Sequence, residues 1–200
     1  SNKLIEAEKK GRLPKILIPV HFAGQPCDMI AIHKLSKKYG FKIIEDASHA
    51  IGASYKNIKV GSCIHSDITI FSFHPVKIIT AGEGGMALTN NDKIANRMTH
   101  FRNSGNTRNK LFMKSSPENE IWNYQQIELG FNYRMTDIHA ALGLSQMSRL
   151  DESINIRHKI AKRYNKELNN FLLRVPYQLE ETYSSYHLYP ILINSKHCSK

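Results

Sequence analysis

The chain has 200 residues, of which 41% are apolar, 22% charged and 9% aromatic. This globular composition excludes wholesale disorder, collagen and coiled coil, and no apolar run approaches the length of a membrane span, so no membrane partner is expected. The formal net charge of +11 attracts polyanions in general, but the basic residues are scattered in short pairs and identify no partner by themselves. Three widely spaced cysteines predict reduced thiols in a cytoplasmic compartment.

Short apolar runs that alternate with helical patterns predict a sheet in the first half of the chain. The strands are expected at 15–20, 41–44 and 67–73, with a return strand at 84–89. Residues 29–39 carry apolar side chains at helical spacing, Asp28 can cap the start of this helix, and Gly40 follows its last turn. A strand, a helix and a strand joined by short links form a βαβ unit, which favours an α/β fold with parallel strands.

The second half of the chain predicts helices and one long loop. A helix is expected over 92–102, and the polar stretch 103–126 is expected to be a surface loop. A long helical pattern runs over 136–170, with a break near Asp151. The segment 186–193 predicts a final strand.

The first candidate functional segment is EDASHA at 45–50, which ends an apolar strand. Open α/β sheets bind ligands outside the carboxyl ends of their strands, where Asp46 can hold a cationic ligand nitrogen. The competing interpretation is that Asp46 only caps a turn.

The second candidate segment is FSFHPVKIITAGEGG at 71–85. A lysine that follows a buried strand and is wrapped in apolar and glycine-rich sequence can be partly desolvated, which lowers its pKa as a Schiff-base lysine requires. Lys77 is that lysine, and the neighbouring glycines let the backbone approach a ligand closely. The competing interpretation is an exposed lysine in a glycine turn.

The third candidate segment is GFNYRMTDIHAALG at 130–143. Asn132 and Arg134 precede a helix, and helix starts bind anions. The alternative is a loop followed by a helix whose small residues pack on a neighbour. The histidines lack zinc-ligand spacing, so no metal site is expected, and no GxSxG elbow supports a serine-hydrolase triad.

Together with VHFAGQPCDM at 20–29, these ordered segments resemble the DegT/DnrJ/EryC1/StrS family of sugar aminotransferases. The resemblance implies the fold of aspartate aminotransferase, which is fold type I of the enzymes that use pyridoxal 5'-phosphate, with a three-layer, mostly parallel sheet. It is strongest to the branch that aminates UDP-4-keto-6-deoxy-N-acetylhexosamines. The product of that branch is UDP-4-amino-4,6-dideoxy-N-acetyl-altrosamine, on the way to pseudaminic acid.

Five residues take roles from this resemblance. Lys77 matches the lysine that condenses with the cofactor aldehyde and then moves protons, and Asp46 matches the carboxylate that pairs with the pyridinium nitrogen. His49 falls beside the ring hydroxyl, and Ser72 matches a ligand of the cofactor phosphate. Asn132 matches a residue that reaches the phosphate of the partner subunit's site, which implies a homodimer.

The implied reaction moves an amino group from glutamate to the 4-keto group of a UDP-linked sugar, for surface polysaccharide biosynthesis. Family members are longer, so the chain is expected to be a central part of such an enzyme. Residues 1–134 would be part of the cofactor-binding large domain, 135–170 the connecting helix, and 171–200 the start of the small C-terminal domain. Apolar surface and association are then expected as well.

Three alternatives remain open at this point. An inactive remnant of the family could act only as an oligomerising module. A related branch dehydrates sugars and carries histidine at the position of Lys77, so Lys77 speaks against it. A nucleic-acid binder would fit the net charge, but no nucleic-acid motif supports it, and no nucleic-acid partner is expected.

Overall fold

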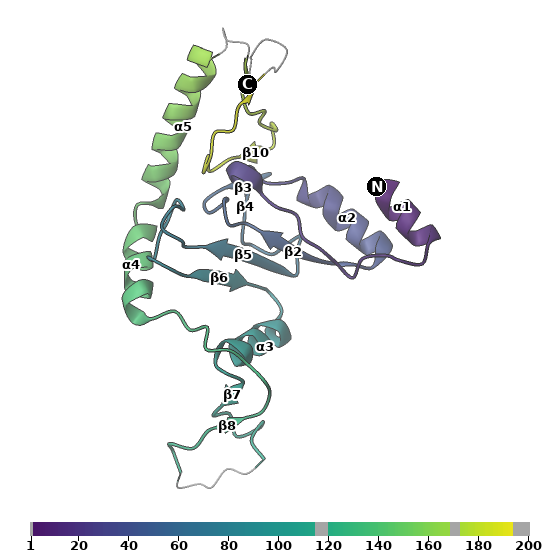
Figure 1. Ribbon diagram of the computed structural model, residues 1–200, viewed down its shortest axis with the longest axis vertical. Helices are drawn as coiled ribbons and strands as arrows, with labels where there is room; N and C mark the ends of the chain where they lie inside the picture. The colour runs from purple at the N-terminus through teal and green to yellow at the C-terminus, as the bar shows by residue number, and fades with distance from the viewer. Residues whose placement is uncertain (1, 115–119, 169–172, 194–200) are drawn as a thin grey trace.

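The computed structural model describes residues 2–114, 120–168 and 173–193. Its centre is a four-stranded sheet in the order β1-β2-β5-β6 (Figure 1). The strands are β1 (Ile16–Leu17), β2 (Lys42–Asp46), β5 (Ile68–Ser72) and β6 (Gly85–Leu88). The first three run parallel and β6 pairs antiparallel to β5, which confirms the predicted α/β sheet with its return strand.

The first strand is much shorter than the predicted run over 15–20. After Leu17 the pairing is reduced to a single bridge between Val20 and Asp46. Pro19 lies between Leu17 and Val20 in the chain and has no N–H to donate to a neighbouring strand. Its carbonyl still accepts a hydrogen bond from the Asp46 amide at 2.9 Å. The strand predicted at 41–44 instead extends through Asp46.

Helix α2 (Met29–Tyr39) connects the first two strands and has the predicted ends. The Asp28 side chain accepts a hydrogen bond from the Ala31 amide at 3.0 Å, and Gly40 adopts a left-handed conformation with φ of 77°. The helix packs its apolar face on the sheet in a core cluster formed by Met29, Tyr39, Phe41, Ile43 and Tyr55. Helix α1 (Asn2–Lys9) lies beside α2 at the edge of the molecule (Figure 1).

A second core cluster lies under the loops that follow β2 and β5. It consists of Ala47, Ala50, Ala53, Phe71, Phe73, Ile79 and Ala81. The loop after β2 leads into a hairpin of β3 (Ser54–Tyr55) and β4 (Ile58–Lys59), and β10 (Thr182–Tyr183) pairs with β3. Residues from the far end of the chain are thereby brought beside the first half.

Below the sheet in Figure 1, an arm formed by the described residues of 103–134 follows helix α3 (Asp92–Arg102). The prediction of a loop over 103–126 missed one pairing, because β7 (Asn106–Thr107) runs antiparallel to β8 (Gln125–Gln126). Residues 115–119 of that loop lie outside the described residues.

The predicted break in the long helix is confirmed. Helix α4 (Asp137–Met147) ends just before α5 (Leu150–Glu167) begins. The predicted strand over 186–193 is reduced to β11 (Leu192–Ile193), which pairs with β9 (Leu173–Arg174). Tyr186 has a φ of 46°, which no extended strand accommodates.

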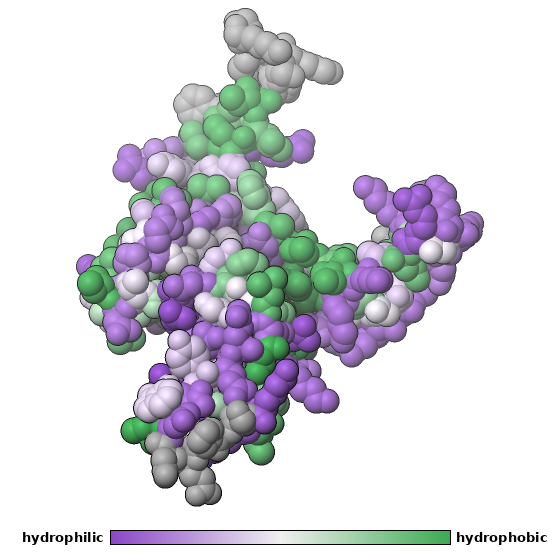
Figure 2. Space-filling model, turned by 60° about the horizontal axis from the view of Figure 1, so that its bottom comes forward, coloured by the Kyte–Doolittle hydropathy of each residue, from purple (hydrophilic) through white to green (hydrophobic). Residues whose placement is uncertain are grey.

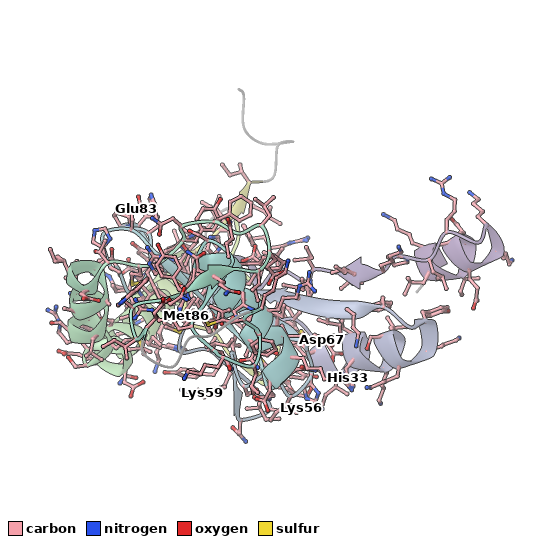
Figure 3. All side chains as sticks on the ribbon, turned by 90° about the horizontal axis from the view of Figure 1, so that it is seen from below. His33, Lys56, Lys59, Asp67, Glu83 and Met86 are labelled. Atoms are coloured by element: carbon pink, nitrogen blue, oxygen red, sulfur yellow. The ribbon has the colours of Figure 1, made fainter. Side chains whose placement is uncertain are left out.

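Some of the basic side chains lie beside acidic partners in the fold. Lys56 and Lys59 lie on the β3–β4 hairpin, at the edge opposite to Glu83 in Figure 3. Lys56 forms an ion pair with Glu181 at 2.9 Å, and Lys42 forms one with Asp67 at 3.1 Å. These pairs offset part of the basic excess locally.

Large apolar side chains are exposed on the arm and on α4. Ile121 and Leu129 are 90% and 81% exposed on the arm, and Ile138 at the start of α4 is 82% exposed. Figure 2, which turns the arm toward the viewer, shows apolar surface between polar side chains on this side. No helix among the described residues is long and apolar enough to cross a membrane.

Two glycines with left-handed backbones give a matched stability prediction. A Cβ at Gly40 would meet no atom, whereas one at Gly105, with φ of 70°, would collide with the carbonyl of Glu128. Gly40→Ala is expected to cost about 1 kcal/mol of unfolding free energy from backbone strain alone. Gly105→Ala is expected to cost at least about 2 kcal/mol and to speed amide exchange in α3 and β7. Equal losses in urea denaturation, with unchanged exchange, would contradict this assignment.

Candidate functional site

Asp46 and Ser72 end two neighbouring parallel strands, so both lie at the carboxyl edge of the sheet. Asp46 is half-buried, and its Oδ1 accepts a hydrogen bond from the Ser48 amide at 3.0 Å. Burial by itself would raise the pKa of Asp46, but the hydrogen bonds from Ser48 and the charges of His49 and Lys77 lower it. Asp46 is therefore an anion at neutral pH.

Lys77 lies in the turn that follows β5, and it is half-buried. Its amide donates to the carbonyl of His74 at 2.9 Å, which closes the turn, and buried Ile78 and Ile79 follow it directly. The ammonium group of Lys77 lowers the pKa of Asp46 and that of His49. The structure thus brings Lys77 to the same edge of the sheet as the carboxylate that the sequence singled out.

His49 completes this group from the loop after β2. Its Nδ1 accepts a hydrogen bond from the Ala23 amide at 3.3 Å, so the ring is neutral and carries its proton on Nε2. Burial and then the charge of Lys77 lower the pKa of His49, against the opposing effect of Asp46. His49 can therefore act as a neutral donor at Nε2.

The other two predicted residues, Ser72 and Asn132, lie in different parts of the structure. Ser72 is half-buried at the end of β5, where its Oγ accepts from the His74 amide at 3.4 Å. Asn132 lies on the arm and forms a bridge with Asn103 beside α3. No hydrogen bond or ion pair among the described residues links Asn132 to Asp46 or Lys77. The structure therefore groups Asp46, His49, Ser72 and Lys77 at the sheet edge and leaves Asn132 apart.

His187 also belongs to this neighbourhood, although no sequence motif singles it out. Its ring lies against that of His49, with the centroids 4.5 Å apart, and the hydroxyl of Ser185 donates to the His49 carbonyl at 2.9 Å. Burial and then the charges of His49, Lys77 and Arg157 lower the pKa of His187 to about 4. A polar ring within the apolar run YHLYPILI was the one signal available.

A buried polar network lies on the other face of β2. Glu45 precedes Asp46 and points away from it, so its Oε2 meets Nε2 of fully buried His21 at 2.7 Å. Its other oxygen accepts from Ser66 and, at 3.0 Å, from Thr69. The His21 amide in turn donates to the Asp46 carbonyl at 3.0 Å. This network therefore fixes the strand end that carries Asp46.

The ion pair in this network sets the charge of both partners. Burial alone would lower the pKa of His21, but its bonds to Cys27 and Glu45 raise it from 6.5 to about 9. The Cys27 amide also approaches Nδ1 of His21 at 3.1 Å, which only a neutral ring accepts. Protonation of Nδ1 gives up that contact, but the bond from Nε2 to the Glu45 carboxylate is kept and is strengthened by the added charge. Hydrogen bonds from His21 and Ser66 lower the pKa of Glu45, although its burial opposes them.

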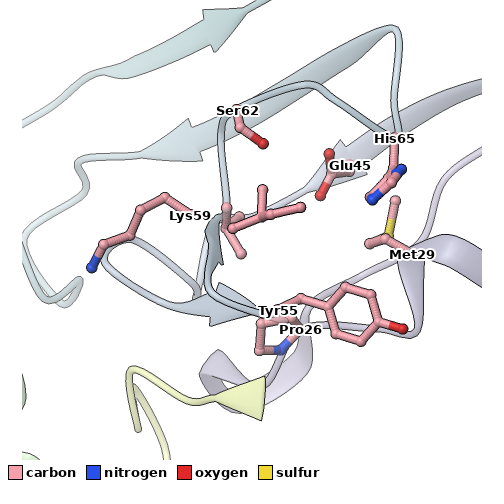
Figure 4. Close-up of a pocket in the computed structure, with 9 residues that line it drawn as sticks. Pro26, Met29, Glu45, Tyr55, Lys59, Ser62 and His65 are labelled. Carbon is pink, nitrogen blue, oxygen red and sulfur yellow. The ribbon is translucent and has the colours of Figure 1, made fainter. Parts of the chain in front are cut away.

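A small cavity beside Glu45 is separate from the edge that carries Asp46 and Lys77. Figure 4 shows Pro26, Met29, Tyr55 and His65 around it. Its volume of about 20 Å³ has room for a water molecule and for nothing as large as a cofactor. No group of three or more potential metal ligands occurs among the described residues.

Solved structures of sugar aminotransferases share this fold. The aminotransferase TlmJ of Streptoalloteichus hindustanus has a TM-score of 0.83 and 26% identity, over 95% of this chain and 49% of that one. PseC of Helicobacter pylori, described as an aminotransferase involved in the biosynthesis of pseudoaminic acid, has a TM-score of 0.80 and 31% identity, over 92% and 47% of the two chains. The fold is therefore fold type I of the transferases that use pyridoxal phosphate.

The model of the DegT/DnrJ/EryC1/StrS aminotransferase family matches residues 2–200, and the chain belongs to this family. An uncharacterized protein of Methanocaldococcus jannaschii is 42% identical over 90% of this chain and 46% of its own length. A UDP-4-amino-4,6-dideoxy-N-acetyl-beta-L-altrosamine transaminase of Campylobacter jejuni is 40% identical over 87% and 43%. The chain thus spans about half the length of the curated relatives that it matches.

The cofactor of the family is pyridoxal phosphate, as the resemblance implied. A sugar aminotransferase of Streptococcus pneumoniae with the same fold has been solved in its PLP and PMP forms, at TM-scores of 0.76 and 0.77.

The His21–Glu45 pair predicts how stability depends on pH. The raised pKa of His21 contributes stability that is complete below pH 6.5 and is lost as the pH rises toward about 9. The lowered pKa of Glu45 contributes stability that is present above its ordinary value of 4.5 and is lost as the pH falls through its folded value. Urea denaturation is therefore expected to show falling stability between pH 6.5 and 9.

The matched variant for this prediction is Glu45→Gln. It is expected to lose about 3–5 kcal/mol of stability at pH 6, because it leaves His21 buried without its counter-charge. It is also expected to lack the decline above pH 6.5. A variant with the wild-type pH profile would show that this pair does not set the profile.

Proposed function

We propose that the protein of which this chain is part transfers an amino group from glutamate to the 4-keto group of a UDP-linked 6-deoxy-N-acetylhexosamine, with pyridoxal phosphate as cofactor. The observation that carries the proposal is the meeting of an amine, a carboxylate and a neutral imidazole at the carboxyl edge of a parallel sheet. Lys77 is close enough to lower the pKa of both Asp46 and His49.

The donor set at this edge fits the cofactor. Asp46 is an anion that can pair with a protonated pyridine nitrogen, and His49 presents its Nε2 proton to a ring oxygen. Ser72 ends β5 beside the Lys77 turn and would hold the phosphate. Asn132 would reach the phosphate from a second copy of the chain, which agrees with its place on the arm. These roles are part of the proposal.

When bound, the cofactor supplies an electron sink for the carbon that carries the amino group. Asp46 would favour a protonated ring nitrogen, because its lowered pKa keeps it an anion at neutral pH. Lys77 would hold the aldehyde carbon of the cofactor and would move a proton at its Nζ. Lys77 is half-buried, and its charge acts on the Asp46 carboxylate at the same sheet edge.

The substrate part of the proposal depends on the relatives. The transaminase of Campylobacter jejuni is 40% identical, and the structurally similar PseC of Helicobacter pylori belongs to the biosynthesis of pseudoaminic acid. We therefore propose a place in nucleotide-sugar and surface polysaccharide biosynthesis, on the way to pseudaminic acid. The formal net charge of +11 suits a substrate that carries a diphosphate.

We further propose a homodimer in the cytoplasm, with the domain division given by the sequence. Residues 1–134 would form part of the large domain, 135–170 the connecting helix, and 171–200 the start of the small domain. Exposed apolar side chains on the arm and on α4 support association with a second copy. Free Cys27 and Cys63 agree with a reducing compartment.

The same exposed apolar surface supports a second candidate, an inactive family member that serves only to form oligomers. The two candidates differ in whether Lys77 reacts with the cofactor. A stable oligomer that takes up no pyridoxal phosphate would favour the second one.

Lys77→Ala tests the proposal directly. Wild-type chain mixed with pyridoxal phosphate is expected to gain a visible absorption band, because the Nζ of Lys77 condenses with the aldehyde, and borohydride is expected to fix the pyridoxyl group on Lys77. The variant is expected to lose the band and the mass increment on that peptide. Lys37→Ala, an exposed lysine of α2, serves as the control and should behave like wild type. An identical band in the Lys77 variant would defeat the assignment.

A further inference from the structure

His187 and His49 are 138 residues apart in the chain and yet share one ring contact. Their centroids are 4.5 Å apart at an angle of 44°. The Nδ1 atom of His187 is buried and has no hydrogen-bond partner among the residues that the structure describes. Buried polar atoms without a partner are rare in proteins. Burial leaves Nδ1 of His187 without a hydrogen bond, so the ring contact with His49 is the interaction that the buried side chain makes.

Helix α5 holds the segment that carries His187. Nη1 of Arg157 donates to the carbonyls of Tyr186 and His187, at 3.1 Å and 3.3 Å. The next residue of the helix, His158, donates from Nε2 to the carbonyl of Ser184 at 2.7 Å. Two successive side chains of one helix thus hold the backbone of residues 184–187.

The other side of the segment contacts the loop that orients His49. The amides of Ser185 and Leu188 donate to the carbonyls of Gly24 and Ala23, at 3.0 Å and 3.2 Å. The Ala23 amide is the donor to Nδ1 of His49. A Cβ on Gly24 would come within 2.6 Å of the Ser185 hydroxyl, so this approach requires glycine. His49 is thereby held by its own hydrogen bond and by the ring of His187.

We propose that His187 is a positioning residue of the amino-transfer site, which holds His49 as a neutral ring with its proton on Nε2 and ties that arrangement to helix α5. This inference rests on the proposed function in one respect, that His49 faces the cofactor. The charged groups nearest the pair are Lys77, Asp46 and Arg157. A second cation beside Lys77 is unfavourable, so the two tilted rings are stable as neutral imidazoles.

The test uses nitrogen-15 NMR of the histidine rings in the chain without cofactor. In wild type, His49 is expected to be protonated at Nε2 only at pH 7, with a pKa below 6.5. His187→Ala exposes His49 to water, so its pKa is expected to rise by about half a unit or more and both tautomers to appear. His187→Phe keeps a ring over His49 and is expected to retain the wild-type tautomer.

The control is His33→Ala, which removes one ring of another histidine pair, His33 and His65, with centroids 5.6 Å apart. It should leave the His49 signals unchanged. If His187→Ala does not fold, Arg157→Gln is the second variant. It keeps both histidines but removes the hydrogen bonds that hold the carbonyls of Tyr186 and His187. A smaller rise in the pKa of His49 is then expected. The proposal would be overturned if His49 kept its wild-type tautomer and pKa in His187→Ala. If His187→Ala does not fold, the same result in a folded Arg157→Gln would overturn it.

A second measurement separates this inference from the proposed function. Affinity for pyridoxal phosphate is expected to fall about tenfold in His187→Ala and less than about twofold in His187→Phe. If wild type forms no adduct at Lys77, the proposed function fails while the NMR result still decides the role of His187. If the adduct forms and His187→Ala binds the cofactor as tightly as wild type does, the positioning role is wrong.

Discussion

The attraction between the Asp46 carboxylate and the Lys77 ammonium, at one edge of a parallel sheet, is the interaction on which the candidate site depends. Neither group is fully exposed, and each is brought there by a different strand: Asp46 ends β2, and Lys77 lies in the turn after β5. The register of the two strands places Asp46 opposite Ile70, two residues before the end of β5. The parallel pairing therefore brings the two charges to the same edge of the sheet.

Successive side chains of β2 point to opposite faces of the sheet, so Glu45 and Asp46 lie in different surroundings. Asp46 belongs to the candidate site, whereas Glu45 enters the buried network with His21. Because the His21 amide also bonds to the Asp46 carbonyl, the network fixes the backbone of the residue that bears the site carboxylate. A chain that spans about half the length of its relatives thus contains a candidate cofactor edge whose backbone is held by a buried network.

The sequence predicted those parts of the fold that are determined locally. The caps of α2 follow from Asp28 and Gly40, whose conformational preferences act within one turn. The parallel order of the main strands and the break between α4 and α5 were also predicted from the sequence pattern. The family resemblance, with its ordered motifs, led to the same sheet edge. The length of β1 was overestimated because Pro19 interrupts a run that is otherwise apolar.

The contribution of His187 could not be predicted in this way. Its place depends on long-range bonds from Arg157 and His158 and on the approach of Gly24, none of which leaves a periodic pattern. The Glu45–His21 pair was missed for the same reason, since only the folded chain brings the two together. Local sequence therefore indicates candidate site residues, and tertiary contacts decide which other residues lie against them.

The most direct test of the central interaction is the pKa of Asp46, followed by carbon-13 NMR of its carboxyl group in wild type and in Lys77→Met. The account predicts that Asp46 titrates below its ordinary value in wild type and at a higher pH once the cation is removed. An Asp46 titration that is the same in both proteins would contradict it.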